Sequence, residues 1–277
     1  MPNPDPFRYD DRHVLVVGGA SGMGEAAVRI AADRGARVTV VDHTDLDHSV
    51  HTSLRADLRE LAAVDAALGR VDGPVDAVVC AAGVADGTPG LMRVNFIGHR
   101  HIVETLVADG RLGRGGAICM ISSVAGLGWE RNIPTLSDFL ATSDYSAASA
   151  WLDARGVGDY MFSKQAMNCY VAQQSFSLMT KGIRINAVCP GPTDTPLARA
   201  NAETWLGFGQ DYRAATGLEP LSPDEIGSVI TFLNSDAARG ISGVNLLVDQ
   251  GYIFSSLSGG YEPGAMIQTM LLGQPAQ

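Results

Sequence analysis

A glycine-rich turn between an apolar run and an amphipathic stretch most constrains how this chain can fold. The run His13–Val17 is rich in β-branched residues and stops at Gly18, and residues 25–34 then show the apolar spacing of a helix. Glycines let a backbone approach a pyrophosphate, and a helix N-terminus offers unpaired N–H groups. The strand–turn–helix context therefore predicts a dinucleotide cradle. Its expected residues are Gly18, Ser21, Gly22, Met23 and Gly24.

An acidic residue ends the next predicted strand. That strand covers residues 37–41 and stops at Asp42, 18 residues after the glycine turn. A carboxylate here accepts hydrogen bonds from an adenosine ribose diol and repels a 2′-phosphate, which predicts NAD rather than NADP as the cofactor. The alternative is a solvated aspartate in a loop. A short third strand ends near Arg55, and the following Asp57 and Leu58 are expected at the adenine.

Strand and helix patterns alternate along the rest of the chain. Strands are predicted over 75–79, 117–121, 183–188 and 244–248, and helices over 58–68, 91–108, 159–180 and 223–233. This alternation implies an α/β, doubly wound Rossmann fold with a seven-stranded parallel sheet in the order 3-2-1-4-5-6-7. Ligands bind at the carboxyl edge of such a sheet. The segments expected there are Ala81, Ala82 and Gly83, then Ser122 and Ser123, and then residues 189–196.

A tyrosine and a lysine four residues apart lie near the start of the helix predicted over 159–180. Tyr160 precedes Lys164, and the chain has only two lysines among its 20 basic residues. Positions i and i+4 share a helix face, so the ammonium can approach the phenol oxygen. A nearby positive charge lowers the pKa of a phenol from its ordinary value of ~10, which would let Tyr160 exchange a proton near neutral pH. The alternative is a pair that merely shares a helix surface.

The remaining segments are expected to surround this core within a single domain, residues 1–277. Residues 1–11 predict a short, extended N-terminal arm. Residues 127–156 are interpreted as an insertion with one or two short helices that could wall a substrate pocket, because the segment has its own apolar side chains. Residues 197–221 predict a lid over an apolar ligand, with a plain helical excursion packed on the core as the alternative. The tail, residues 252–277, could close a neighbouring subunit's site or an interface.

Charge and cysteine usage argue against several classes of partner. The net charge is −10 and the isoelectric point is about 4.9, which disfavours nucleic acid and anionic membranes. No apolar run reaches the ~18–20 residues of a membrane helix, and the N-terminus lacks the apolar core of a secretory signal. The four cysteines lie in apolar runs without metal-ligand spacing. This pattern predicts buried, reduced thiols in a cytoplasmic protein and no metal site.

From residue 14 to residue 251 the chain resembles the short-chain dehydrogenase/reductase family. The resemblance rests on VGGASGMG, the acid after the second strand, AAG, VNFIG, ISSVAG, YMFSK and NAVCPGPTDTP, all in the family's order. The long insertion, CAAG and the Ala-Asp-Leu element look most like the branch of bacterial 3α-hydroxysteroid dehydrogenase/carbonyl reductases and coniferyl alcohol dehydrogenases. The resemblance implies NAD, a bulky apolar alcohol or ketone as the substrate, and a homodimer or homotetramer.

The family's motifs imply roles for individual residues. Asn95 resembles the asparagine that holds a water of a proton relay, and Ser123 resembles the serine that hydrogen-bonds the substrate oxygen. Tyr160 resembles the general acid/base, and Lys164 resembles the lysine that binds the nicotinamide ribose and lowers the tyrosine pKa. Thr195 resembles the residue that fixes the carboxamide. The residues expected beside the nicotinamide are Pro190, Gly191 and Thr193.

These features predict reversible, NAD-dependent oxidation of an alcohol, with Tyr160 taking the hydroxyl proton. Two alternatives stay open. The chain could be a dinucleotide-binding sensor or scaffold of the same fold without turnover. It could also be an enzyme of this fold that uses NADP, which Asp42 opposes.

Overall fold

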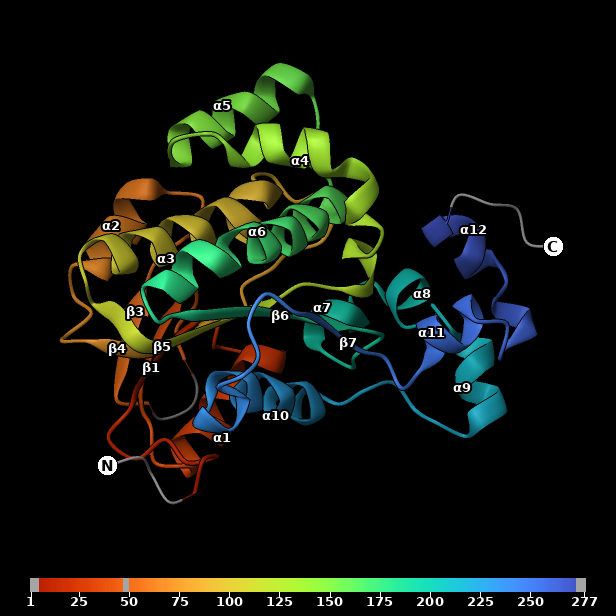
Figure 1. Ribbon diagram of the computed structural model, residues 1–277, viewed down its shortest axis with the longest axis horizontal. Coiled ribbons are helices and arrows are strands. Elements are labelled where there is room, and N and C mark those ends of the chain that lie inside the picture. Colours follow the sequence, from red (N-terminus) through yellow and green to blue (C-terminus); the bar gives the residue numbers. More distant parts are fainter. Residues whose placement is uncertain (1–4, 47–49, 273–277) are drawn as a thin grey trace.

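Seven parallel strands form one sheet at the centre of the molecule (Figure 1). The computed structural model describes residues 5–46 and 50–272. The strands are β1 (His13–Val17), β2 (Arg37–Asp42), β3 (Thr52–Arg55), β4 (Val75–Cys80), β5 (Leu112–Ile121), β6 (Arg184–Pro190) and β7 (Asn245–Val248). They pair in the order β3-β2-β1-β4-β5-β6-β7, and each pairing is parallel. The predicted Rossmann fold and strand order are confirmed.

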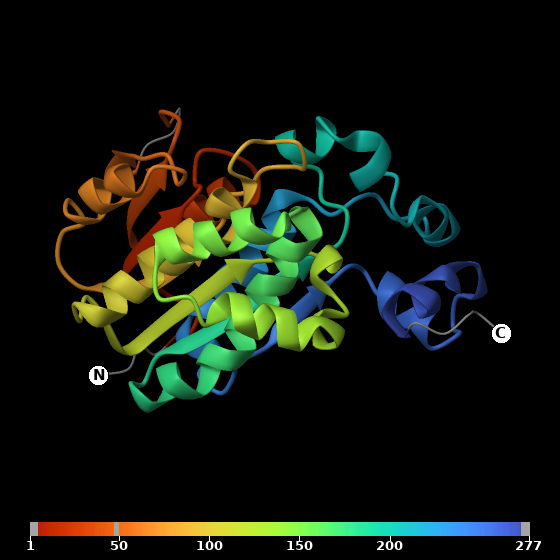
Figure 2. The same ribbon diagram turned by 90° about the horizontal axis from the view of Figure 1, so that it is seen from above.

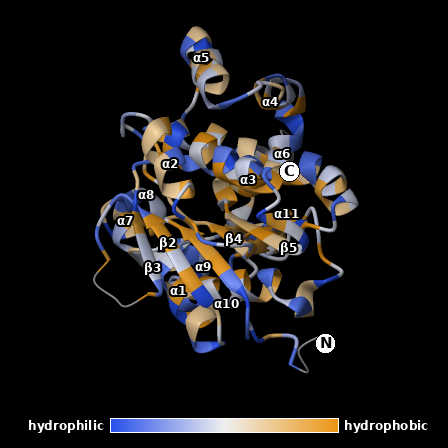
Figure 3. Ribbon diagram, turned by 90° about the vertical axis from the view of Figure 1, so that its left-hand side faces the viewer, coloured by the Kyte–Doolittle hydropathy of each residue, from blue (hydrophilic) through white to orange (hydrophobic). Residues whose placement is uncertain are grey.

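Helices cover both faces of this sheet (Figure 1). One face carries α1 (Gly22–Asp33) and α10 (Pro223–Asn234), and the other carries α2 (Leu61–Leu68), α3 (Gly98–Ala108) and α6 (Tyr160–Thr180). Successive side chains of β1 point to opposite faces of the sheet and so enter the hydrophobic core on each side. Leu15 and Val17 pack on the α6 side, and Val14 and Val16 pack on the α1 side. Figure 3 shows the hydrophobic strands between the two helix layers. A sheet buried on both faces gives its carboxyl edge a rigid base.

Some element boundaries differ from the predicted ones. The helix predicted over 91–108 spans those residues, but it contains a π-helical turn, Arg93–Ile97, which includes Asn95 and leads directly into α3. Such turns occur frequently at functional sites. β5 begins five residues earlier than predicted, at Leu112, since its glycine-rich start carries no hydrophobic period. α10 begins as expected, with Ser222 as the N-cap in a capping box with Glu225.

The insertion forms a third layer outside α3 and α6 (Figure 1). It contains a 3₁₀ turn (Trp129–Asn132), α4 (Ile133–Leu140) and α5 (Tyr145–Arg155). Phe139 lies at its centre, with ring centroids 5.2 Å from Trp151, 5.6 Å from Phe96 in the π turn and 5.6 Å from Phe162 in α6. The apolar side chains of the insertion therefore pack against the helices that carry the predicted catalytic residues.

Two further segments lie together at one end of the molecule (Figures 1 and 2). The expected lid contains α7 (Pro196–Arg199), α8 (Ala202–Trp205) and α9 (Gln210–Thr216), and the tail contains α11 (Tyr252–Leu257) and α12 (Met266–Leu272). Aromatic rings join them. Tyr252 lies 5.3 Å from Phe208 and 5.2 Å from Tyr212, and Tyr261 lies 5.1 Å from Tyr212, measured between ring centroids. The tail thus packs against the lid of its own chain.

The described part of the N-terminal arm, residues 5–11, is formed of turns instead of an extended segment. Its Tyr9 is buried in the core beneath α10, where the hydroxyl donates a hydrogen bond to the carbonyl of Thr231. This burial explains the difference, because a turn is needed to bring the ring back onto the core. Residues 1–4 lie outside the described part of the chain. Across residues 5–46 and 50–272, no helix is long and apolar enough to cross a membrane.

Candidate active site

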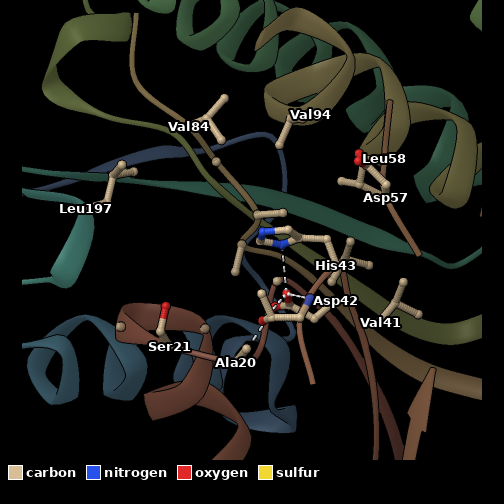
Figure 4. A pocket seen from close by; sticks show the side chains of 18 of the residues that line it. Ala20, Ser21, Val41, Asp42, His43, Asp57, Leu58, Val84, Val94 and Leu197 are labelled. Atoms are coloured by element: carbon tan, nitrogen blue, oxygen red, sulfur yellow. Dashed lines mark hydrogen bonds and ion pairs between the residues drawn. The ribbon is translucent and has the colours of Figure 1, made fainter. Parts of the chain in front are cut away.

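A cavity of about 580 Å³ opens at the carboxyl ends of β1, β2 and β4 (Figure 4). Its wall contains most of the residues predicted for the dinucleotide. They are Gly18, Ser21, Gly22, Met23, Gly24, Asp42, Asp57, Leu58, Ala81, Ala82, Gly83 and Thr195. Other residues that were not predicted also line the cavity, among them His43, Thr44, Arg59 and Leu197. No motif marks these four positions, because loop geometry alone turns them toward the cavity.

The glycine turn packs so tightly against neighbouring backbone that it has no room for a Cβ atom at Gly18 or Gly24. A Cβ atom on Gly18 would lie 2.2 Å from the backbone nitrogen of Ala82, and Gly18 also has a positive φ of 88°. A Cβ atom on Gly24 would lie 1.9 Å from the carbonyl oxygen of Gly18. The turn therefore offers bare backbone at the N-terminus of α1, where free N–H groups and the helix dipole favour a phosphate. This geometry fits the pyrophosphate of a dinucleotide.

Asp42 ties the glycine turn to the end of β2. Its Oδ2 accepts a hydrogen bond from the backbone N–H of Ala20 at 3.0 Å. Its Oδ1 accepts from the backbone N–H of Thr44 at 3.0 Å and lies 3.1 Å from Nδ1 of His43. Figure 4 shows the His43 ring beside this carboxylate in the cavity. Asp42 is thus a brace for the cradle as well as a candidate partner for a ribose.

Asp57 is held by the side chain and the backbone of Arg59, a contact that was not predicted. Its carboxylate accepts from the Arg59 guanidinium, with 2.9 Å between Nε and Oδ2, and from the Arg59 backbone N–H at 2.9 Å. The Arg59 side chain thereby holds the pKa of Asp57 below its ordinary value. Both residues line the cavity, so the proposed contact between Asp57 and adenine stays a prediction about a carboxylate that already has a partner.

A second cavity of about 410 Å³ adjoins the first. The two share Met23, Ala81, Gly83, Thr195 and Leu197 in their walls. The second cavity brings together the predicted residues from three separate elements. These are Ser123 after β5, Tyr160 and Lys164 on α6, and Pro190, Gly191, Thr193 and Thr195 after β6. The carboxyl edge of the sheet places them side by side, although up to 72 residues separate them along the chain.

Tyr160 and Lys164 lie in the first two turns of α6. Asp159 is the N-cap of this helix, and its side chain accepts from the backbone N–H of Phe162. The Lys164 ammonium lies 5.4 Å from the centroid of the Tyr160 ring and donates to the carbonyl of Ile121 at 2.8 Å. The neighbouring Ser122 hydroxyl donates to the Lys164 carbonyl at 3.2 Å, so Ser122 holds the helix backbone.

The pKa of Tyr160 moves in the direction opposite to the expected one. Burial raises it to about 12, and a hydrogen bond with the Ser123 hydroxyl opposes that rise. Burial also lowers the pKa of Lys164 to about 8. Burial therefore outweighs the expected effect of the Lys164 ammonium, and a lowering of the phenol pKa by Lys164 stays a prediction. The physical reason is that both groups are desolvated and the ammonium is turned toward the Ile121 carbonyl.

Asn95 lines neither cavity, because its side chain is fully buried behind them. Its Oδ1 accepts from the backbone N–H of Val84 at 2.8 Å, and its Nδ2 donates to the Val84 carbonyl at 3.0 Å. Nδ2 also lies 3.3 Å from the Ser163 hydroxyl oxygen. The amide is therefore used to join the loop after β4 to α6. Its role in a proton relay stays a prediction.

Aromatic residues of the lid close the outer side of the second cavity. Trp205 and Phe208 line it, and the Trp205 ring lies 4.8 Å from the Tyr160 ring between centroids. Residues 127–156 contribute nothing to this wall. The expectation that the insertion walls the pocket was wrong, because its apolar face is already covered by α6 and the π turn. The sequence shows apolar content but not which neighbour covers it.

Comparisons with known proteins agree on one family. A family model described as enoyl-(acyl carrier protein) reductase matches residues 18–253. Coniferyl-alcohol dehydrogenase from a Pseudomonas species is 28% identical, over 88% of this chain and 98% of that protein. Cis-4-hydroxycyclohexanecarboxylate dehydrogenase from Sinomonas cyclohexanicum is 31% identical, over 88% of this chain and 97% of that protein. The crystal structure of 3-alpha-hydroxysteroid dehydrogenase from Pseudomonas sp. B-0831 complexed with NADH matches with a TM-score of 0.69 at 26% identity, over 90% of this chain and 99% of that chain.

Proposed function

Because the chain belongs to the short-chain dehydrogenase/reductase family, we propose that it interconverts an alcohol and a ketone or aldehyde with NAD as the cofactor. One observation carries this proposal. Ser123, Tyr160 and Lys164 converge on an apolar cavity that adjoins a bare glycine cradle. The cradle fits a dinucleotide, and Asp42 at the end of β2 favours NAD over NADP by charge.

The chain's own residues handle the proton in this reaction. When bound, the nicotinamide supplies or accepts the hydride. Ser123 holds the reacting oxygen, and Tyr160 takes the hydroxyl proton during oxidation or gives it back during reduction. Since burial raises the pKa of Tyr160, it favours the phenol form, which suits reduction. Oxidation is expected to accelerate as pH rises and the phenolate forms.

Lys164 supports both the cofactor and the tyrosine in this proposal. An ammonium has three donors, and one of them is used by the Ile121 carbonyl. The other two are free to bind hydroxyls of a nicotinamide ribose. A positive charge on the bound cofactor would also favour the Tyr160 phenolate, opposite to the effect of burial.

The second cavity favours a bulky, apolar and uncharged substrate, such as a steroid-like or aromatic alcohol. Its wall includes Val124, Met161, Trp205 and Phe208. Lys164 is the one basic side chain in that wall among the described residues, and we assign it to the cofactor. A carboxylate on the substrate would therefore have no dedicated partner. The relative from Sinomonas is named for a hydroxy acid. Comparing the turnover of a neutral cyclohexanol with that of its carboxylate-bearing analogue therefore tests whether this cavity accepts a carboxylate.

An assay matrix tests the proposal. NAD and NADP are each combined with hydroxysteroids, cinnamyl-type alcohols, cyclohexanols and an enoyl thioester, the last because of the family model's description. Tyr160→Phe should lower kcat by ~10²–10⁴, the usual contribution of a general acid/base. Tyr261→Phe, in the tail, is the matched control and should leave kcat unchanged. Near-normal turnover by Tyr160→Phe would refute the assignment, and NADH binding without any turnover would favour the sensor alternative.

A further inference from the structure

Asp86 contacts the start of α6, and no sequence motif predicts this contact. It lies in the loop after β4, and its Oδ1 accepts a hydrogen bond from the backbone N–H of Tyr160 at 2.7 Å. The two residues are 74 positions apart in the sequence. Asp86 is exposed and also lines the cavity that contains Tyr160 and Met161. The carboxylate is therefore both a cap for the first N–H of α6 and a charge at the mouth of the site.

Further hydrogen bonds connect the loop that carries Asp86 back to Tyr160 through Asn95 and Ser163. The loop that carries Asp86 is fixed at Val84 by both groups of the Asn95 amide. Asn95 in turn lies 3.3 Å from the Ser163 hydroxyl, which donates to the Tyr160 carbonyl at 2.6 Å. The backbone of Tyr160 is thus held on its N–H side by Asp86 and on its carbonyl side by Ser163. Removing Asp86 frees one of these two sides.

The charge of Asp86 acts on the same residue. The groups that face the Tyr160 phenol are the Ser123 hydroxyl after β5, the Trp205 ring of α8 and the Lys164 ammonium one turn along α6. Asp159, the other nearby carboxylate, is bonded to the N–H of Phe162. Burial is the largest cause that raises the pKa of Tyr160, and the charge of Asp86 adds a smaller rise. A negative charge beside a phenol disfavours the second negative charge of the phenolate.

We propose that Asp86 is a positioning residue with two separable effects on Tyr160. Its oxygen fixes the Tyr160 backbone at the cavity wall, and its charge adds to burial in disfavouring the phenolate. The inference rests on the proposed function, in which Tyr160 is the acid/base. Both effects favour Tyr160 as a proton donor, the role that carbonyl reduction requires of it.

Two substitutions separate the effects. Asp86→Asn keeps a carbonyl oxygen for the Tyr160 N–H but removes the charge, so the acidic limb of the pH–kcat profile for oxidation should move to lower pH with the plateau unchanged. Asp86→Ala removes both and should also lower the plateau, by about 10-fold, because small displacements of a reacting group are costly. Asp144→Asn is the matched control. It removes the same charge and keeps a capping oxygen for α5, outside the cavity, so neither quantity should change.

A second measurement does not depend on turnover. Ultraviolet titration of tyrosinate in the cofactor-free protein, with Tyr160→Phe subtracted, reports the ionisation of Tyr160 alone. Ionisation at lower pH in Asp86→Asn supports the inference even if no alcohol in the assay matrix reacts, in which case only the proposed function fails. The inference is overturned if Asp86→Asn and wild type ionise at the same pH. It is also overturned if Asp86→Ala turns over like Asp86→Asn.

Discussion

Phe139→Ala tests whether the insertion braces the catalytic helix or shapes the substrate pocket. The Phe139 side chain is fully buried, and its ring contacts Phe96, Trp151 and Phe162 at centroid distances of 5.2–5.6 Å. Removing such a ring leaves a cavity and typically costs about 3–5 kcal/mol of unfolding free energy. At about 2.1 cal/mol/K per residue, a chain of 277 residues should lose about 5–9 °C in Tm. Phe176→Ala on α6 is the control, since that side chain is 80% exposed.

The assay pairs thermal unfolding, followed by circular dichroism, with steady-state kinetics well below the Tm. Because no residue of the insertion lines the second cavity, KM for the alcohol should stay within about 2-fold of wild type while the Tm falls. Phe176→Ala should change neither quantity, as expected for an exposed position. A large change in KM or in substrate preference, with the Tm unchanged, would refute the bracing role and restore the insertion as a pocket wall.

Two more predictions concern charge. Asp42→Asn removes the charge and leaves one of the two backbone donors, Ala20 or Thr44, without its acceptor, so the kcat/KM ratio of NAD to NADP should fall at least about 10-fold while the Tm falls slightly; an unchanged ratio would contradict the role of Asp42. Burial lowers the pKa of Lys164 from 10.5 to about 8 in the folded chain. The unfolded chain then holds that proton longer, so Lys164 adds a rise in the free energy of unfolding between about pH 8 and 10.5, against the opposite contribution of the four buried thiols, whose pKa values are raised by burial. Urea unfolding of the cofactor-free protein measures this, and Lys164→Met should lack that rise.

Much of the site was predictable because short motifs sit at the ends of parallel strands. The turn after β1, Ser123 after β5 and residues 190–195 after β6 all meet at one edge of the sheet once the strand order is known. The order follows from the alternation of strands and helices and from the handedness of the crossovers. Local patterns of hydrophobicity and glycine therefore decide where these residues lie, which is why sequence reasoning placed them together.

Other features depend on contacts between distant segments. The sequence contains the aromatic residues of the insertion but not the fact that α6 covers them. The expected lid and tail each have their own pattern, while the packing of Tyr252 on Phe208 and Tyr212 arises only when both lie at one end of the molecule. Whether the segment over 197–221 moves as a lid stays a prediction, as do the roles of the tail and the oligomeric state.

The sequence by itself determined the fold, the cradle and the identity of the residues at the reacting edge, since each follows from spacing along one strand or helix. The tertiary structure decided the electrostatics. It buries Tyr160 and Lys164 together, raises one pKa and lowers the other, and places Asp86 against the N-terminus of α6. A pKa depends on every charge and dipole around a group and on its distance from water. Those neighbours come from β4, β5, α6 and α8, so no stretch of sequence contains them.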